Sequence, residues 1–211
     1  MLEIEVEDDG LKPDLSSMKA VELKGPGGGG LSVKFDFLMH ETGSKIPVKV
    51  EVAYGDVVTP AAIDGAFPTL FEEPALIVPV IPWPTVVAEK FQAIVVGGMT
   101  NGRLKDVYDL ARLSEAVAFE GQVLAEALSN TFRCRDTPIP KGLPTGLTPD
   151  YYESDEIRKQ WNGFLGKYQQ PLALALKDEV EKIAAFVMPI VQALEAGSSL
   201  DVSWPAGGPW S

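Results

Sequence analysis

The sequence predicts an α/β protein of the α+β kind, in which a small mixed or antiparallel sheet precedes a helical region. Two periodicities lead to this prediction. Apolar and polar residues alternate between residues 32 and 37, which is the pattern of a half-buried strand. From Val87 onward, apolar residues recur instead at helical spacing. We therefore divide the chain where the period changes, into a sheet region of residues 1–82 and a helical region of residues 83–211.

Further strands are expected on both sides of the first one. Residues 48–53 alternate in the same way, and residues 41–45 suit a hairpin connection between the two strands. A preceding strand is expected near residues 20–23, before a glycine-rich link. The apolar run at residues 75–80 predicts one more short strand, and its Pro79 favours an edge position or a strand end.

Five helices are expected after residue 83. Pro84 suits a first helical turn, where its missing N–H is not needed, and Ser154 suits an N-cap. A turn-rich linker separates the third helix from the fourth, and the two tryptophans of the C-terminal segment are expected to pack back on the domain. The expected helices cover residues 84–96, 103–113, 121–133, 155–165 and 171–196.

Composition excludes several classes of protein. The chain has 211 residues, of which 45% are hydrophobic and 23% charged, as in ordinary globular proteins. Its formal charge of −12 disfavours non-specific nucleic-acid binding, although a local basic pocket remains compatible with it. No apolar run is long enough to span a membrane. The single cysteine, Cys134, excludes an internal disulfide and suits the cytoplasm. The single histidine excludes a His-rich metal site.

Lys90 is the most unusual residue of the helical region, because apolar residues flank it on both sides in its helix. One interpretation is a lysine that binds phosphate. The other is a structural lysine whose stem covers apolar surface and whose ammonium pairs with Glu89 or with an acid elsewhere.

Charged residues also gather at the start of the next helix. Asp106 and Asp109 are three residues apart and share a helix face, with Arg103 and Lys105 beside them. These cations could pair with the two acids or bind phosphate. The structural alternative is a salt-bridged helix N-terminus, where acids are favoured in any case.

Glu51 is the acid on the second alternating strand. It could belong to a metal site, or it could simply face solvent, because polar residues alternate with apolar ones in such a strand. Asp36 lies on the neighbouring strand, and its parity would place it on the same face as Glu51.

The segments Ala88-Glu89-Lys90-Phe91-Gln92-Ala93 and Arg103-Leu104-Lys105-Asp106-Val107-Tyr108-Asp109-Leu110 resemble the lysine and aspartate motifs of the AbiEii/AbiGii-type nucleotidyltransferase toxins. The resemblance runs from about residue 48 to the C-terminus and includes residues 143–148, 160–165 and 204–210. It implies a partial nucleotidyltransferase-like fold in a bacterial, cytoplasmic toxin–antitoxin protein. Such a protein would transfer a nucleotide from an NTP to a tRNA, another RNA or a protein.

The resemblance also implies roles for particular residues. Glu51, Lys90 and Asp106 would be catalytic and would converge on one cleft. Lys90, Arg103 and Asp109 would bind the nucleotide, and Glu51 would bind Mg²⁺. A cognate antitoxin would be the partner.

Two departures from the family pattern change the expected activity. The Gly-Ser turn and Asp-x-Asp pair with which family members open have no counterpart here, as if the chain began after that segment, and Glu51 stands where Asp is usual. Mg²⁺ prefers near-octahedral oxygen ligation, so we expect Mg²⁺ binding to be weak or absent. The chain alone is therefore expected to be incomplete or inactive as an enzyme. The alternative is a degenerate, non-catalytic module for binding or assembly. A missing strand pair would leave an unpaired edge or apolar patch, covered by dimerisation or by a separately encoded N-terminal segment.

Overall fold

The computed structural model describes residues 9–25, 28–69, 74–100, 102–170, 174–198 and 200–211. The chain forms two compact units, Met1–Asp56 and Val57–Ser211. The α/β character predicted from the sequence is confirmed, since strands fill the first part of the chain and helices most of the second.

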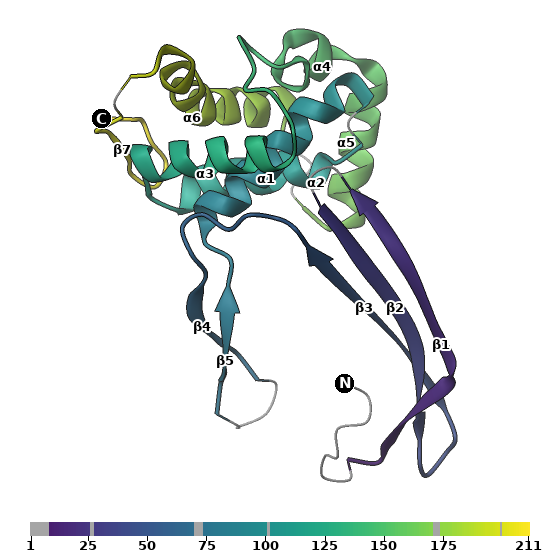
Figure 1. Ribbon diagram of the computed structural model, residues 1–211. Coiled ribbons are helices and arrows are strands. Elements are labelled where there is room, and N and C mark those ends of the chain that lie inside the picture. The colour runs from purple at the N-terminus through teal and green to yellow at the C-terminus, as the bar shows by residue number, and fades with distance from the viewer. Residues whose placement is uncertain (1–8, 26–27, 70–73, 101, 171–173, 199) are drawn as a thin grey trace. The chain divides into compact units, whose positions relative to one another are not determined.

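The first unit is a three-stranded antiparallel sheet in the order β1-β2-β3, drawn as the three long arrows of Figure 1. Its strands are β1 (Leu11–Gly25), β2 (Gly28–Met39) and β3 (Lys45–Tyr54). The expected hairpin closes β2 onto β3, because the Met39 N–H donates to the Ser44 carbonyl at 3.0 Å. All three strands predicted for this region are therefore present. Part of the glycine-rich link, residues 26–27, lies outside the described residues.

In β2 and β3 the register separates an apolar face from a polar one. Val33 of β2 lies between Ala20 of β1 and Val50 of β3, and successive pairs alternate between the two faces. The apolar face is only partly covered: Phe35 is buried, whereas Val50 remains 39% exposed. Other large apolar residues exposed on this face are Leu31, Met39, Ile46, Val52 and Tyr54.

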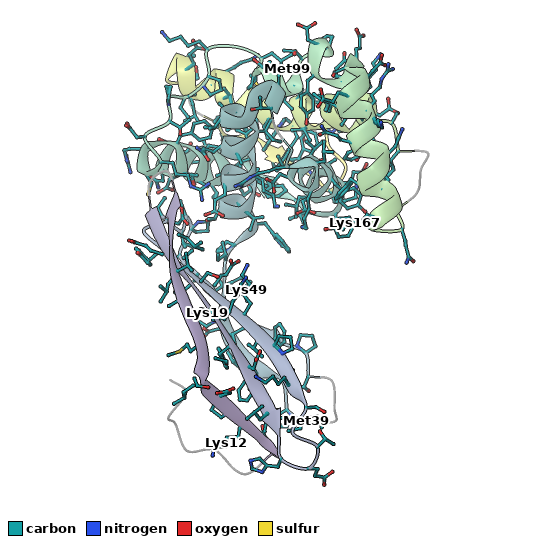
Figure 2. All side chains as sticks on the ribbon, turned by 90° about the vertical axis from the view of Figure 1, so that its right-hand side faces the viewer. Lys12, Lys19, Met39, Lys49, Met99 and Lys167 are labelled. Atoms are coloured by element: carbon teal, nitrogen blue, oxygen red, sulfur yellow. The ribbon has the colours of Figure 1, made fainter. Side chains whose placement is uncertain are left out.

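Three lysines face one another across the polar side of the sheet. Lys19 pairs with Lys34, and Lys34 pairs with Lys49, so the row crosses all three strands. Lys19 and Lys49 lie at a similar level of the sheet in Figure 2, away from the end marked by Lys12 and Met39. Like charges in direct cross-strand register destabilise a sheet.

The second unit begins with a two-stranded antiparallel ribbon, β4 (Ile63–Phe67) and β5 (Leu76–Val80). The strand at β5 was predicted, and its Pro79 lies in a ribbon with no third strand among the described residues. The sequence patterns did not predict β4. The strands before residue 83 thus form two separate antiparallel sheets, and the second of them shares a compact unit with the helices.

The remaining elements are mainly helices, which pack together in Figure 1. Their order follows the predicted one, with two short 3-10 turns, a short helix and a two-residue strand pair that the sequence patterns did not predict. The elements are α1 (Trp83–Gly97), η1 (Gly98–Thr100), α2 (Leu104–Ala116), β6 (Phe119–Glu120), α3 (Gly121–Cys134), η2 (Thr145–Leu147), α4 (Pro149–Glu153), α5 (Asp155–Lys167), α6 (Leu176–Ala196) and β7 (Ser203–Trp204).

Helix starts follow local chemistry in two places and differ from the prediction in one. Pro84 occupies the first turn of α1, and the Ser154 side chain caps α5 by accepting from the Ile157 N–H. The last helix begins at Leu176 and not at residue 171, because Ala175 has an extended backbone. Residues 171–173 of the predicted helix lie outside the described residues.

Aromatic side chains close the core of the second unit, as predicted for the C-terminal segment. The Trp204 indole N–H donates to the Ser114 carbonyl at 2.7 Å, and the Trp210 indole N–H donates to the Phe186 carbonyl at 2.7 Å. The Phe186 ring contacts both tryptophan rings. Each indole thus buries its apolar body while its N–H finds an acceptor.

Candidate functional site

The candidate site begins on α1 with Lys90. This residue lies three positions after Val87 and four before Ile94, both fully buried, so its stem runs along the core-facing side of the helix. Only 20% of its side chain is exposed. A lysine in this position needs an anionic partner near the end of its stem.

Two carboxylates of α2 meet that requirement. The Lys90 Nζ donates to Asp106 Oδ1 at 2.8 Å and to Asp109 Oδ2 at 2.7 Å. Both acids are largely covered, with exposed fractions of 15% and 22%. Their spacing of three residues places both on the face of α2 that looks toward α1. The structure therefore brings together Lys90, Asp106 and Asp109, which we call the Lys90 cluster.

Two further cations lie on the solvent side of the cluster. Lys105 Nζ contacts Asp109 Oδ2 at 2.5 Å, and Arg103 Nη1 lies 3.9 Å from Asp106 Oδ2. Lys105 and Arg103 are 64% and 72% exposed, so both can reach solvent anions while remaining near the acids.

Electrostatics keep the cluster charged. Burial lowers the pKa of Lys90, but hydrogen bonds to Asp106 and Asp109 outweigh this effect and raise the pKa above its usual value. Burial likewise raises the pKa of Asp109, but hydrogen bonds from Lys105 and Lys90 outweigh it and lower the pKa. The cluster thus holds a protonated Lys90 beside an ionised Asp109 near neutral pH.

A second cluster of polar side chains, which joins α1 to the residues just after α3, was not predicted from the sequence. The Arg135 guanidinium donates to Glu89 Oε1 and to Gln92 Oε1, each at 3.1 Å, and the Gln92 amide donates to Thr137 Oγ1 at 2.8 Å. Glu89 therefore pairs with Arg135, whereas Lys90 pairs with α2. No local spacing connects Arg135 to Glu89, which lies 46 residues earlier.

Glu51 lies in the first unit, on β3. Lys49 Nζ contacts its Oε1 at 2.6 Å, and the Glu51 side chain is 51% exposed. The hydrogen bond and charge of Lys49 lower its pKa. Ser32 lies opposite Glu51, whereas Asp36 lies opposite Pro47, so the register places these two acids on the same face but apart along the sheet. The role of Glu51 in the site stays a prediction.

The described residues do not fit a Mg²⁺ site. No group of three or more His, Cys, Asp or Glu side chains gathers within the described part of the chain. The closest candidate, Asp106 with Asp109, offers two carboxylates that already bind the Lys90 ammonium. Since Mg²⁺ prefers near-octahedral oxygen ligation, these two carboxylates, already bound to an ammonium group, do not make a Mg²⁺ site.

Comparison with known proteins identifies one family. The family described as "Nucleotidyl transferase AbiEii toxin, Type IV TA system" matches residues 2–186. No curated protein and no solved structure matches the chain. Among the described residues, no helix is long and apolar enough to cross a membrane.

Proposed function

Because the chain belongs to the AbiEii family of nucleotidyltransferase toxins of type IV toxin–antitoxin systems, we propose that it transfers a nucleotide from an NTP. The acceptor is a hydroxyl group of a tRNA, of another RNA or of a protein. We also propose a cytoplasmic location, where NTPs and such acceptors occur together, and a cognate antitoxin as the partner.

The observation that carries this proposal is the Lys90 cluster. It holds an ammonium group at a fixed place, next to the more exposed cations of Arg103 and Lys105. Positioned cations stabilise the charge that develops during phosphoryl and nucleotidyl transfer. Asp106 and Asp109 keep the lysine protonated and oriented, which is what such a role requires.

The reaction is a displacement at the α-phosphorus of the NTP. The acceptor hydroxyl oxygen forms a bond to this phosphorus, and the bond from phosphorus to the bridging oxygen of the β-phosphate breaks. Pyrophosphate leaves, and the hydroxyl proton is released to solvent. In our proposal Lys90 lies against the phosphate oxygens, while Arg103 and Lys105 attract the triphosphate from the solvent side.

Glu51 is proposed as a further catalytic acid, in keeping with the family resemblance, and it would supply only one of the several oxygen ligands that Mg²⁺ needs. Since this is a single strand carboxylate, we expect metal binding and transfer by this chain alone to be weak.

A transfer assay with labelled NTPs, Mg²⁺ and total tRNA or protein tests the proposal. The expected result is low incorporation that disappears in Lys90→Ala, Asp106→Asn and Glu51→Ala. Lys177→Ala serves as the matched control, because Lys177 is an exposed lysine of α6 whose contact with Glu181 spans 3.7 Å. Transfer that survives all three substitutions would remove the proposed mechanism.

The second candidate function is a non-catalytic module for binding or assembly. The partly exposed apolar face of the β1–β3 sheet favours it, because exposed apolar patches mark interaction sites. Under this alternative no NTP is consumed under any condition of the assay, while the chain forms stable complexes in sedimentation experiments.

A further inference from the structure

A pocket lies beside the Lys90 cluster, between the start of α2 and one face of α5. Its volume is about 590 Å³, within the roughly 300–1,000 Å³ of ligand sites. Residues 102–106 form one wall. The opposite wall consists of residues of α5 and its C-cap at helical spacing, namely Gln160, Gly163, Phe164, Lys167 and Tyr168.

The walls of this pocket carry more positive than negative charge. Arg103, Lys105 and Lys167 line it, and Asp106 is the acid among the lining residues. This local excess of cations occurs in a chain whose formal charge is −12. Anions are therefore favoured at the pocket although the whole molecule repels them.

Aromatic rings line the same pocket. The ring centroids of Phe164 and Tyr168 lie 5.0 Å apart, and Tyr168 remains 49% exposed. The Lys167 ammonium lies 5.3 Å from the centre of the Tyr168 ring. Figure 2 labels Lys167 at the end of α5. Phe164 is partly buried against the core, so Tyr168 is the exposed ring. An exposed aromatic ring next to cations is the combination with which proteins bind a base and its phosphate.

Gly163 leaves room in the pocket on the α5 side. Glycine within a helix costs about 1 kcal/mol relative to alanine. A Cβ at Gly163 would meet no atom within 4 Å, so packing against neighbours does not require glycine there. The missing side chain instead leaves the α5 wall of the pocket open.

We propose that this pocket binds one nucleotide, with its base against Tyr168 and Phe164 and its phosphates toward Arg103, Lys105 and Lys167. The inference deepens the proposed function and rests on it, because it locates a nucleotide next to Asp106. The nucleotide comes either from a free NTP or from the end of an RNA chain.

Equilibrium dialysis with the full chain tests the proposal. The probes are each of the four labelled NTPs and a short single-stranded oligoribonucleotide, which separate the two sources. Gly163→Leu fills the pocket and is expected to weaken binding by about five- to a hundredfold, the range for loss of a stacked base. Gly166→Leu is the matched control. Gly166 lies on the same helix, also has open space around its Cβ position and does not line the pocket, so binding should be unchanged.

Tyr168 provides a second test that does not depend on the glycine variants. Tyr168→Ala should weaken binding by about the same factor, whereas Tyr168→Phe should retain it, because the ring rather than the hydroxyl carries the stacking. Tripolyphosphate, which has no base, should compete poorly. Equal competition by tripolyphosphate together with unchanged binding by Tyr168→Ala would overturn the proposal, and so would the absence of binding of every probe.

The outcomes separate this inference from the proposed function. Nucleotide binding that is lost in Gly163→Leu, without any transfer activity, supports the pocket and contradicts the transferase. Transfer that continues unchanged in Gly163→Leu contradicts the pocket and leaves the transferase standing.

Discussion

Replacing Lys90 by methionine should destabilise the second unit, Val57–Ser211. The substitution keeps an apolar stem but removes the ammonium that binds Asp106 and Asp109. Each hydrogen bond to a charged group contributes about 1.5–3 kcal/mol, and removing one partner of a buried ion pair leaves charge unpaired. Asp109 keeps its contact with Lys105, and part of the cluster is exposed. We therefore expect a loss of about 2–4 kcal/mol in the free energy of unfolding.

Urea unfolding followed by the circular dichroism of the helices measures this loss. The midpoint should fall by roughly 1–2 M urea. Lys177→Met is the control, and as an exposed pair it should change stability by less than about 1 kcal/mol. The triple variant with Asp106→Asn and Asp109→Asn should recover part of the loss, because it carries no unpaired buried charge. Wild-type stability of Lys90→Met, or a triple variant less stable than the single one, would refute this reasoning.

The pH dependence follows from the directions of the pKa shifts. The raised pKa of Lys90 means that its contribution is complete below the unfolded pKa, about 10.4, and is lost as pH rises through the folded value. The lowered pKa of Asp109 means that its contribution is complete above the unfolded pKa, about 3.9, and is lost as pH falls through the folded value. The difference between wild type and Lys90→Met should therefore be constant around neutral pH and shrink below about pH 4.

Three further stability predictions concern other contacts. Glu179→Leu on α6 should cost about 3–5 kcal/mol in urea unfolding, because Glu179 is 1% exposed and pairs with both Arg112 and Lys182; a neutral result would contradict this. Lys34→Thr should stabilise the β1–β3 sheet by about 0.2–1 kcal/mol, less at high salt, because it relieves repulsion from the lysines on both neighbouring strands; hydrogen exchange of the sheet amides measures the gain. Trp204→Phe should cost about 0.5–1.5 kcal/mol in thermal unfolding, because the Ser114 carbonyl loses the indole donor and keeps only the Gly207 N–H at 3.0 Å; unchanged stability would contradict a contribution of the indole hydrogen bond.

Local patterns predicted much of the fold, because their information is contained in a few consecutive residues. Alternation was enough for β2 and β3, and helical spacing with a suitable first turn was enough for α1. The strand β4 escaped prediction because it has only five residues with Gly65 at its centre, and it is a strand only through its pairing with β5.

The candidate site was predictable to a different extent. Lys90, Asp106 and Asp109 stood out by their motif, and α1 and α2 are neighbouring helices, so these side chains meet across a short connection. The link between Arg135 and Glu89 depends on the packing of α3 against α1. The α5 wall of the pocket likewise depends on tertiary packing, which no spacing within one segment reveals.

The cations of the site fall into two groups, which differ in their contacts with carboxylates and in their exposure to solvent. Lys90 is already bound by two carboxylates at 2.7–2.8 Å, so an approaching phosphate must compete with both of them. Arg103 and Lys105 are more than 60% exposed and can turn toward a ligand at lower cost. The attraction of a nucleotide should therefore come mainly from the exposed cations around the pocket. Lys90 instead fits a role that needs a fixed position, because its low exposure and two hydrogen bonds restrict its movement.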